Sequence, residues 1–221
     1  MKDTCALFKV PFVEVESSVA PRAALTQLIV GAAYTLEAVG LARSISHELN
    51  ETGKELIVLR NRLRTEVSSE KNRAKQMASR LLERFVVLYS LQRMSSVARR
   101  FKNQLAENAK QVAKFDLLPE AGHNEVEAWH ELDKNMMTVL IRGQAETNFE
   151  RSAFQAFKST LSTRPKTKSL EVSLMTRRGL SELLSPILLL DYVTVYLAIL
   201  KGVDPTPTKF IEMYKARLRN R

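Results

Sequence analysis

The sequence predicts an α/β fold in the C-terminal part of the chain, with a parallel sheet flanked by helices. Short runs that are apolar and rich in β-branched residues are typical of buried strands, and they occur at Phe85–Ser90, Met136–Ile141 and Leu170–Met175. Helical patterns fall between and after these runs, at about 94–111, 147–162 and 179–200. Alternation of strands and helices indicates helical crossovers and therefore a parallel sheet covered on its faces.

The first 82 residues lack this alternation. Ala6–Val15 is a short β-type stretch broken by Pro11, and we expect it to be the last strand of a larger domain. One helix is predicted from Pro21, because proline suits a first helical turn, and a second from about Asn50 through Leu82. The expected parts are therefore a remnant of a first domain at 1–19, linker helices at 20–82, and a C-terminal domain at 83–221 that closes with a helix at about 207–218.

The composition excludes a secreted, disulfide-built protein. The 221 residues include one cysteine, Cys5, so no intramolecular disulfide can form, and the chain is expected in the cytoplasm. Charged residues interrupt the first apolar runs, so we predict no signal peptide. The long apolar run Leu183–Leu200 contains Pro186 and Asp191, which favours a buried helix of a soluble domain, and we expect no membrane partner.

The chain is basic, with a formal net charge of +10 and a pI near 9.8. Residues 41–110 hold 15 Lys and Arg against 7 Asp and Glu, an excess of +8. This surface could bind nucleic acid, attract phosphorylated metabolites, or form solvated helix faces without a ligand. No zinc-finger spacing, RNA-binding aromatic signature or helix-turn-helix pattern supports the first interpretation, and we expect no nucleic-acid partner. Glycine-rich nucleotide-binding motifs are absent as well.

Ligands of parallel α/β sheets bind beyond the carboxyl ends of the strands, which points to the turns after Ser90 and Arg142. Ser90 is therefore a candidate substrate-binding residue. Two further residues could carry acid–base chemistry: His123, in a loop with proline and glycine, and Glu107, on a charged helix. Each alone is explained as well by an incidental or solvated side chain. Together with nearby Lys and Arg, they could supply the base, the ring-opening group and the cations that aldose–ketose isomerisation requires.

Four blocks, in order along the chain, make this combination specific: Pro21–Leu25, Phe101–Lys110, Leu118–Trp129, and Tyr196–Pro207 with Ile211 and Lys215. They closely resemble blocks of the bifunctional phosphoglucose/phosphomannose isomerases of archaea and some bacteria, and the resemblance covers essentially the whole chain. It implies two sugar isomerase (SIS) domains, each a three-layer arrangement of a parallel sheet and helices, and a homodimer.

The resemblance also implies roles for individual residues. Glu107 matches the base that moves the proton between C1 and C2, and Arg22 matches the arginine that stabilises the enediolate. His123 matches the ring-opening histidine, which in this family reaches the site from the partner subunit. Lys215 matches a lysine that assists ring opening, and Thr208 a position associated with accepting mannose phosphates. The implied substrate is a phosphorylated hexose, and the implied mechanism passes through a cis-enediol with no metal and no cofactor.

One departure from the family pattern leaves alternatives open. The family's first domain carries Ser/Thr-rich loops that grip the sugar phosphate, and this chain begins near that domain's last strand. We therefore expect a fragment or late start of a longer gene, a second chain that supplies the missing half, or a protein without activity. The alternative function is a non-catalytic SIS-type module that binds phosphosugars or assembles with a partner.

Overall fold

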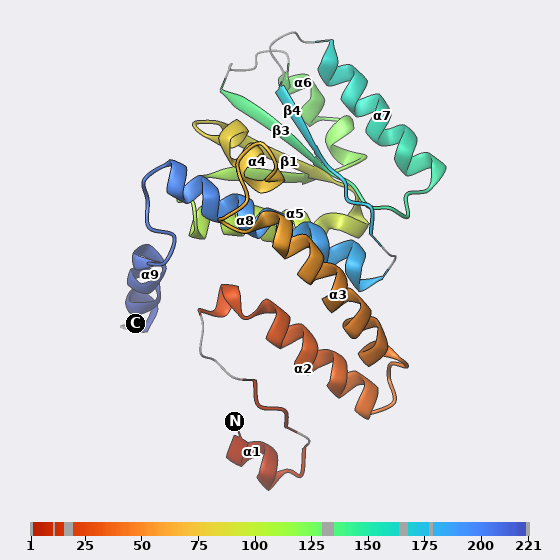
Figure 1. Ribbon diagram of the computed structural model, residues 1–221, viewed down its shortest axis with the longest axis vertical. Helices are drawn as coiled ribbons and strands as arrows, with labels where there is room; N and C mark the ends of the chain where they lie inside the picture. Colours follow the sequence, from red (N-terminus) through yellow and green to blue (C-terminus); the bar gives the residue numbers. More distant parts are fainter. Residues whose placement is uncertain are drawn as a thin grey trace. The chain divides into compact units, whose positions relative to one another are not determined.

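The computed structural model describes residues 2–10, 12–15, 20–129, 135–163, 168–176 and 179–219. These residues form two compact units, Met1–Lys54 and Glu55–Arg221. The long helix α3 (Ile45–Leu63) contributes residues to both units. The helices and strands are shown in Figure 1.

The N-terminal unit is helical. It contains α1 (Lys2–Leu7), the 3-10 turn η1 (Pro21–Ala23), α2 (Leu25–Ala38) and the start of α3. The helix predicted from Pro21 therefore begins as a 3-10 turn. Several large apolar side chains of this unit are exposed, among them Leu7, Phe8 and Leu41.

The strand predicted over Ala6–Val15 is wrong. Its first residues belong to α1, and no strand occurs within residues 2–10 and 12–15. A strand without a neighbour would leave its N–H and C=O groups unpaired, whereas a helical turn pairs them locally. The N–H of Phe8 donates to the carbonyl of Thr4 at 3.1 Å, and that of Val10 to the carbonyl of Cys5 at 2.9 Å.

The second unit contains a parallel four-stranded sheet in the order β2-β1-β3-β4, which confirms the α/β fold predicted from the sequence. The strands are β1 (Phe85–Ser90), β2 (Ala113–Leu117), β3 (Met136–Ile141) and β4 (Lys168–Val172). The bounds of β1 and β3 are those expected from the sequence, and β4 begins two residues before the predicted strand. β2 was missed because it is a short edge strand in which two charged residues, Lys114 and Asp116, interrupt the apolar pattern.

Helices cover both faces of this sheet (Figure 1). On one face, α4 (Arg73–Leu81), α5 (Ser95–Glu107) and α8 (Leu180–Leu200) enclose an apolar cluster that includes Val86 and Leu88 of β1. On the other, the segment around α6 (Glu125–Ala128) and the helix α7 (Asn148–Ser162) enclose a cluster with Val87 and Tyr89. Successive β1 side chains therefore point alternately into the two clusters, as expected for a strand that is buried on both faces of the sheet.

The helix predicted from Asn50 through Leu82 is divided into α3 and α4. Asn72 begins α4: its fully buried side chain accepts hydrogen bonds from the N–H groups of Ala74 and Lys75 and donates to the carbonyl of Arg64. Such a side-chain cap satisfies amides that have no partner in the first turn of a helix. α4 packs against α8 and so belongs to the unit that contains the sheet.

By length and apolar composition α8 is a candidate membrane span, but it lies inside the domain. More than half of its most apolar window is buried, and it packs against α4 and α5. Arg100 of α5 forms an ion pair with Asp191 of α8, at 2.6 Å between Nη2 and Oδ2. Burial raises the pKa of the Asp191 carboxyl, although the hydrogen bond from Arg100 acts in the opposite direction. We conclude that α8 is a core helix, as the sequence predicted.

Candidate active site

The carboxyl ends of β1 and β3 lie side by side in the sheet, because Ser90 pairs in register with Ile141. The connection from β1 goes to β2 on one side, whereas β3 continues to β4 on the other, so this is the topological switch point at which such sheets bind ligands. Ser90 is fully buried, and its Oγ has no hydrogen-bond partner within the residues that the structure describes. The turns expected to hold ligands therefore meet at one place.

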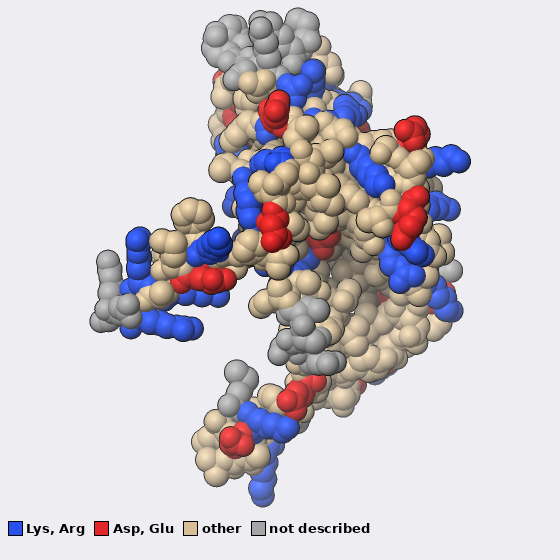
Figure 2. Space-filling view, turned by 60° about the vertical axis from the view of Figure 1, so that its left-hand side comes forward, with Lys and Arg blue, Asp and Glu red and all other residues tan. Residues whose placement is uncertain are grey.

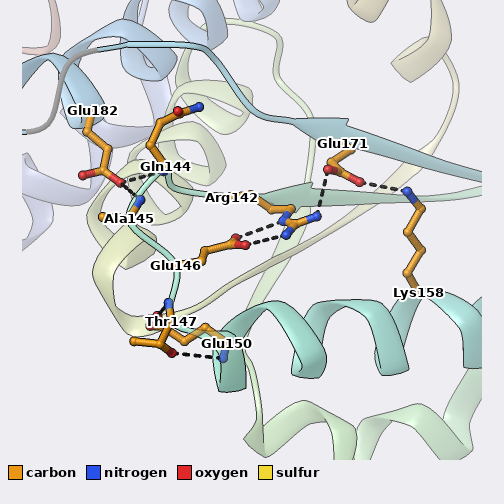
Figure 3. A network of polar contacts seen from close by, with 9 residues as sticks. All are labelled: Arg142, Gln144, Ala145, Glu146, Thr147, Glu150, Lys158, Glu171 and Glu182. Carbon is orange, nitrogen blue, oxygen red and sulfur yellow. Dashed lines mark hydrogen bonds and ion pairs between the residues drawn. The ribbon is translucent and has the colours of Figure 1, made fainter.

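The loop that follows β3 is held by a carboxylate from α8 (Figure 3). Oε1 of Glu182 accepts hydrogen bonds from the backbone N–H groups of Gln144, at 2.7 Å, and Ala145, at 3.1 Å. Oε2 of Glu182 lies 3.7 Å from Nη1 of Arg93, which belongs to the turn η2 (Gln92–Met94) after β1. The Glu182 carboxylate thus joins the two loops of the switch point. The sequence analysis did not single it out.

The same loop carries a second polar network, centred on Arg142 (Figure 3). The Arg142 guanidinium binds Glu146 through two nitrogens, with 2.9 Å between Nε and Oε1, and donates from Nη1 to Oε1 of Glu171 at 3.1 Å. Lys158 of α7 binds the other oxygen of Glu171 at 2.9 Å. The bidentate pair raises the pKa of Arg142. At the start of α7, Thr147 and Glu150 form a reciprocal capping box.

Glu171 is expected to make the stability of the domain depend on pH. Burial alone would raise its pKa, but Lys158 and Arg142 outweigh burial and hold the pKa below the ordinary value of 4.5. The carboxylate therefore contributes stability above the unfolded-state pKa, and this contribution is lost as the pH falls through the lower folded-state value. Melting temperatures measured from about pH 7 to pH 3.5 should fall less steeply for Glu171→Gln than for the wild type. Parallel curves for the two proteins would contradict this prediction.

His123 lies at the carboxyl end of β2, directly after the turn η3 (Glu120–Gly122), and its side chain is exposed. A buried network fixes the segment that carries it. The Tyr89 hydroxyl donates to Oε1 of Glu125 at 2.9 Å and accepts from Nε1 of Trp129 at 2.9 Å. Nζ of Lys114 lies 3.0 Å from Oε2 of Glu125. Burial and the adjacent Glu125 carboxylate raise the pKa of Tyr89, so the phenol stays neutral and donates this hydrogen bond.

Replacing Tyr89 with phenylalanine is expected to loosen the segment that holds His123. The ring would remain packed in the core, but the Trp129 N–H and Glu125 would each lose a buried partner, at a cost of about 2 kcal/mol. Urea unfolding should show this loss, and hydrogen exchange should rise in residues 118–129 more than in β3. An unchanged midpoint and unchanged exchange in 118–129 would show that the hydroxyl does not position the segment.

Lys110 links the segments that carry Glu107 and Thr208, at the end of β2 opposite His123. Glu107 is the last residue of α5 and is half-buried. Nζ of Lys110 donates to the backbone carbonyls of Glu107, at 2.5 Å, and Pro207, at 2.8 Å. Thr208 follows Pro207 and donates from Oγ1 to Glu212 at 3.3 Å, at the start of α9 (Lys209–Arg219). Lys215 is exposed on α9, two turns further on.

Within one chain, the structure does not bring Glu107 and His123 together. Glu107 precedes β2 and His123 follows it, so the two residues lie at opposite ends of this five-residue strand, about 15 Å in length. Ser90 lies at the carboxyl ends of the strands, on the same side of the sheet as His123. Arg22 is half-buried in η1 of the N-terminal unit.

The other two histidines add no further candidate. His47 is exposed on α3, and His130 lies outside the described residues. Within the described ranges, no group of three or more His, Cys, Asp and Glu side chains is placed to hold a metal ion.

The basic residues are dispersed on the face seen in Figure 2, in several groups with Asp and Glu among them. One group belongs to α9, which carries Lys209, Lys215, Arg217 and Arg219 against one acidic residue, Glu212. Nucleic-acid recognition would favour a continuous basic stripe. The distribution on this face instead supports solvated helix faces.

The sheet order and the polar loops at its switch point define a doubly wound α/β domain of the kind that binds small ligands at one edge. The family model "Bacterial phospho-glucose isomerase C-terminal SIS domain" matches residues 70–218, and the chain belongs to this family. The resemblance predicted from the sequence blocks is thereby confirmed.

Two curated relatives are each called bifunctional phosphoglucose/phosphomannose isomerase. The protein of Caldicellulosiruptor bescii is 29% identical over 93% of this chain and 62% of its own length. The protein of Aquifex aeolicus is 31% identical over 75% of this chain and 52% of its own length. The chain therefore spans between half and two thirds of these relatives.

A solved structure shares the fold. A glucose-6-phosphate isomerase like protein from Thermus thermophilus superposes with a TM-score of 0.64 at 24% identity, covering 89% of this chain and 64% of that one. At this level of identity the similarity concerns the fold.

Proposed function

We propose that this chain carries the acid–base part of an aldose–ketose isomerase that interconverts glucose 6-phosphate, and mannose 6-phosphate, with fructose 6-phosphate. Family membership supports the reaction class, because the matched relatives are named for it. The observation that carries the proposal is the set of matching positions, with Glu107 half-buried at a helix end and His123 exposed on a segment that a buried network fixes.

In the proposed mechanism, His123 opens the sugar ring and Lys215 assists. The Glu107 carboxylate then removes a proton from C2 of the aldose, or C1 of the ketose, and the protonated Glu107 delivers a proton to the neighbouring carbon. Arg22 stabilises the negative charge of the cis-enediolate between the two transfers. Thr208 contacts the substrate. Ser90, the other residue that the sequence suggested for this role, is fully buried at the carboxyl ends of the strands, opposite Glu107, and is assigned no contact with the sugar. No step requires a metal or a cofactor, and the expected location is the cytoplasm.

We propose a homodimer in which the partner's copy of His123 completes the site. The separation of Glu107 and His123 across β2 supports this arrangement, because one copy does not place both residues at the same edge of the sheet. Exposed apolar side chains of the N-terminal unit, such as Phe8 and Leu41, also favour association.

The alternative is a non-catalytic SIS-type module. This chain covers 62% and 52% of the length of the two relatives. The part of each relative that it does not cover could contain the residues that bind the sugar phosphate, which favours the non-catalytic alternative for this chain alone. A coupled assay that converts fructose 6-phosphate to glucose 6-phosphate separates the two functions. Activity that Glu107→Gln abolishes supports the isomerase, and absence of activity in both proteins rules out catalysis by the isolated chain.

A further inference from the structure

Two backbone amides and a guanidinium surround one buried carboxylate at the switch point. The N–H groups of Gln144 and Ala145 donate to the same oxygen, Oε1 of Glu182, and Arg93 lies beside the other oxygen. Only 5% of Glu182 is exposed. Figure 3 shows the carboxylate directed at the turn of the β3–α7 loop, where the two amides point toward it. Successive amides that converge in this way form an anion-binding concavity.

Gly143 is what allows the loop to approach the anion so closely. A Cβ at this position would lie 2.6 Å from Oε1 of Glu182 and 3.3 Å from Sδ of Met94. Any larger side chain at this position would require the carboxylate to shift from its contact with the amides. Glycines that let a backbone contact an anion directly are typical of phosphate-binding loops.

The concavity also lies where sheets of this type bind ligands. It lies at the carboxyl ends of β1 and β3, where a doubly wound sheet binds its ligand. Ser90 ends β1 at this edge, on the face of the sheet that α8 covers, and its buried hydroxyl lacks a partner within the described residues. The two amides and the guanidinium are donors of the kind that an oxyanion requires.

We propose that this is a site for a phosphate-sized oxyanion which Glu182 occupies as an internal substitute. Beyond Cβ, the glutamate side chain has four heavy atoms, and inorganic phosphate has five. Removal of the side chain therefore opens a space of nearly the right size, with its donors in place. The native chain binds no phosphate there, so this edge of the sheet does not grip a substrate phosphate. The proposal does not depend on isomerase activity.

Thermal unfolding of the full chain tests the proposal, with inorganic phosphate added to a phosphate-free buffer. Glu182→Ala should melt below the wild type without phosphate. At a phosphate concentration of 100 times Kd, its melting temperature should rise by roughly 5–10 °C. The wild type and Glu182→Gln should not respond, because each still fills the site. In ¹⁵N NMR spectra of Glu182→Ala, the amide signals of Gln144 and Ala145 should shift with phosphate.

A matched control removes a carboxylate from the first turn of α7, which follows the loop. Oε2 of Glu150 accepts from the N–H of Thr147 at 2.7 Å, so Glu150→Ala loses the same charge and frees one amide, outside the concavity. It should not respond to phosphate. The proposal is overturned if folded Glu182→Ala shows neither response, or if the wild type or Glu150→Ala responds equally. Should Glu182→Ala fail to fold without phosphate, recovery on refolding with phosphate supports the proposal, and failure to recover contradicts it.

Discussion

Replacing Glu107 with glutamine is expected to lower kcat for fructose 6-phosphate by about three orders of magnitude, with little effect on folding. Glutamine keeps the shape of the side chain but cannot accept the proton from the sugar carbon. The fold should tolerate the change because Glu107 is half-buried at the end of α5, and Lys110 binds its backbone carbonyl, which the substitution retains. The measurement is a coupled assay of glucose 6-phosphate formation, with circular dichroism to verify folding.

Glu127→Gln provides the matched control for that variant. Glu127 is an exposed residue of α6, so its substitution removes one carboxylate from the same domain at a position without an assigned role in the proposed mechanism. Its kcat should equal that of the wild type. Equal losses in both variants, or an unchanged kcat in Glu107→Gln, would show that Glu107 is not the base.

Replacing Arg142 with methionine is expected to destabilise the domain by about 3 kcal/mol, which corresponds to a fall in melting temperature of roughly 6–12 °C. Arg142 binds both oxygens of Glu146, whose side chain is only 7% exposed, and also neutralises Glu171. Methionine would leave a buried carboxylate without its partner, which costs more than the pair itself contributes. The measurement is chemical unfolding monitored by circular dichroism.

The double variant Arg142→Met/Glu146→Leu should recover most of this loss, because two apolar side chains can replace a buried ion pair at little cost. Arg64→Met serves as an exposed control: Arg64 pairs with Glu66 at 3.3 Å, but both side chains are more than half exposed. That substitution should leave the melting temperature nearly unchanged. Additive losses in the double variant would contradict the assigned role of Arg142.

The sequence predicted the parts of the fold whose signals are local. The strands β1 and β3 are continuous apolar runs, and their bounds agree with the structure. The edge strand β2 was missed because its charged residues weaken that signal. The division between α3 and α4 depends on the capping side chain of Asn72 in a strongly basic stretch, where the apolar spacing suggested one continuous helix. For Ala6–Val15, β propensity without a partner strand did not produce a strand.

In the candidate site, too, the sequence indicated features with local signals and missed those that depend on contacts between distant residues. Sequence motifs suggested Glu107 and His123 as candidates, because each lies in a block that can be recognised along the chain, and their roles stay a proposal. The contacts of Glu182 and Tyr89 could not be predicted from spacing: Glu182 binds amides 37 and 38 residues away, and Tyr89 contacts Glu125 and Trp129, 36 and 40 residues away. The opposite placement of Glu107 and His123 also became visible only when β2 was located between them.

The most direct test of the central claim, that Glu107 transfers a proton between the sugar carbons, is isomerisation of fructose 6-phosphate in D₂O followed by NMR. A carboxylate base exchanges the proton that it holds with solvent while the cis-enediol is present. The wild type should therefore produce glucose 6-phosphate with deuterium at C2, and Glu107→Gln should incorporate none in the same time. Product formed without deuterium, or equal incorporation by both proteins, would contradict the account.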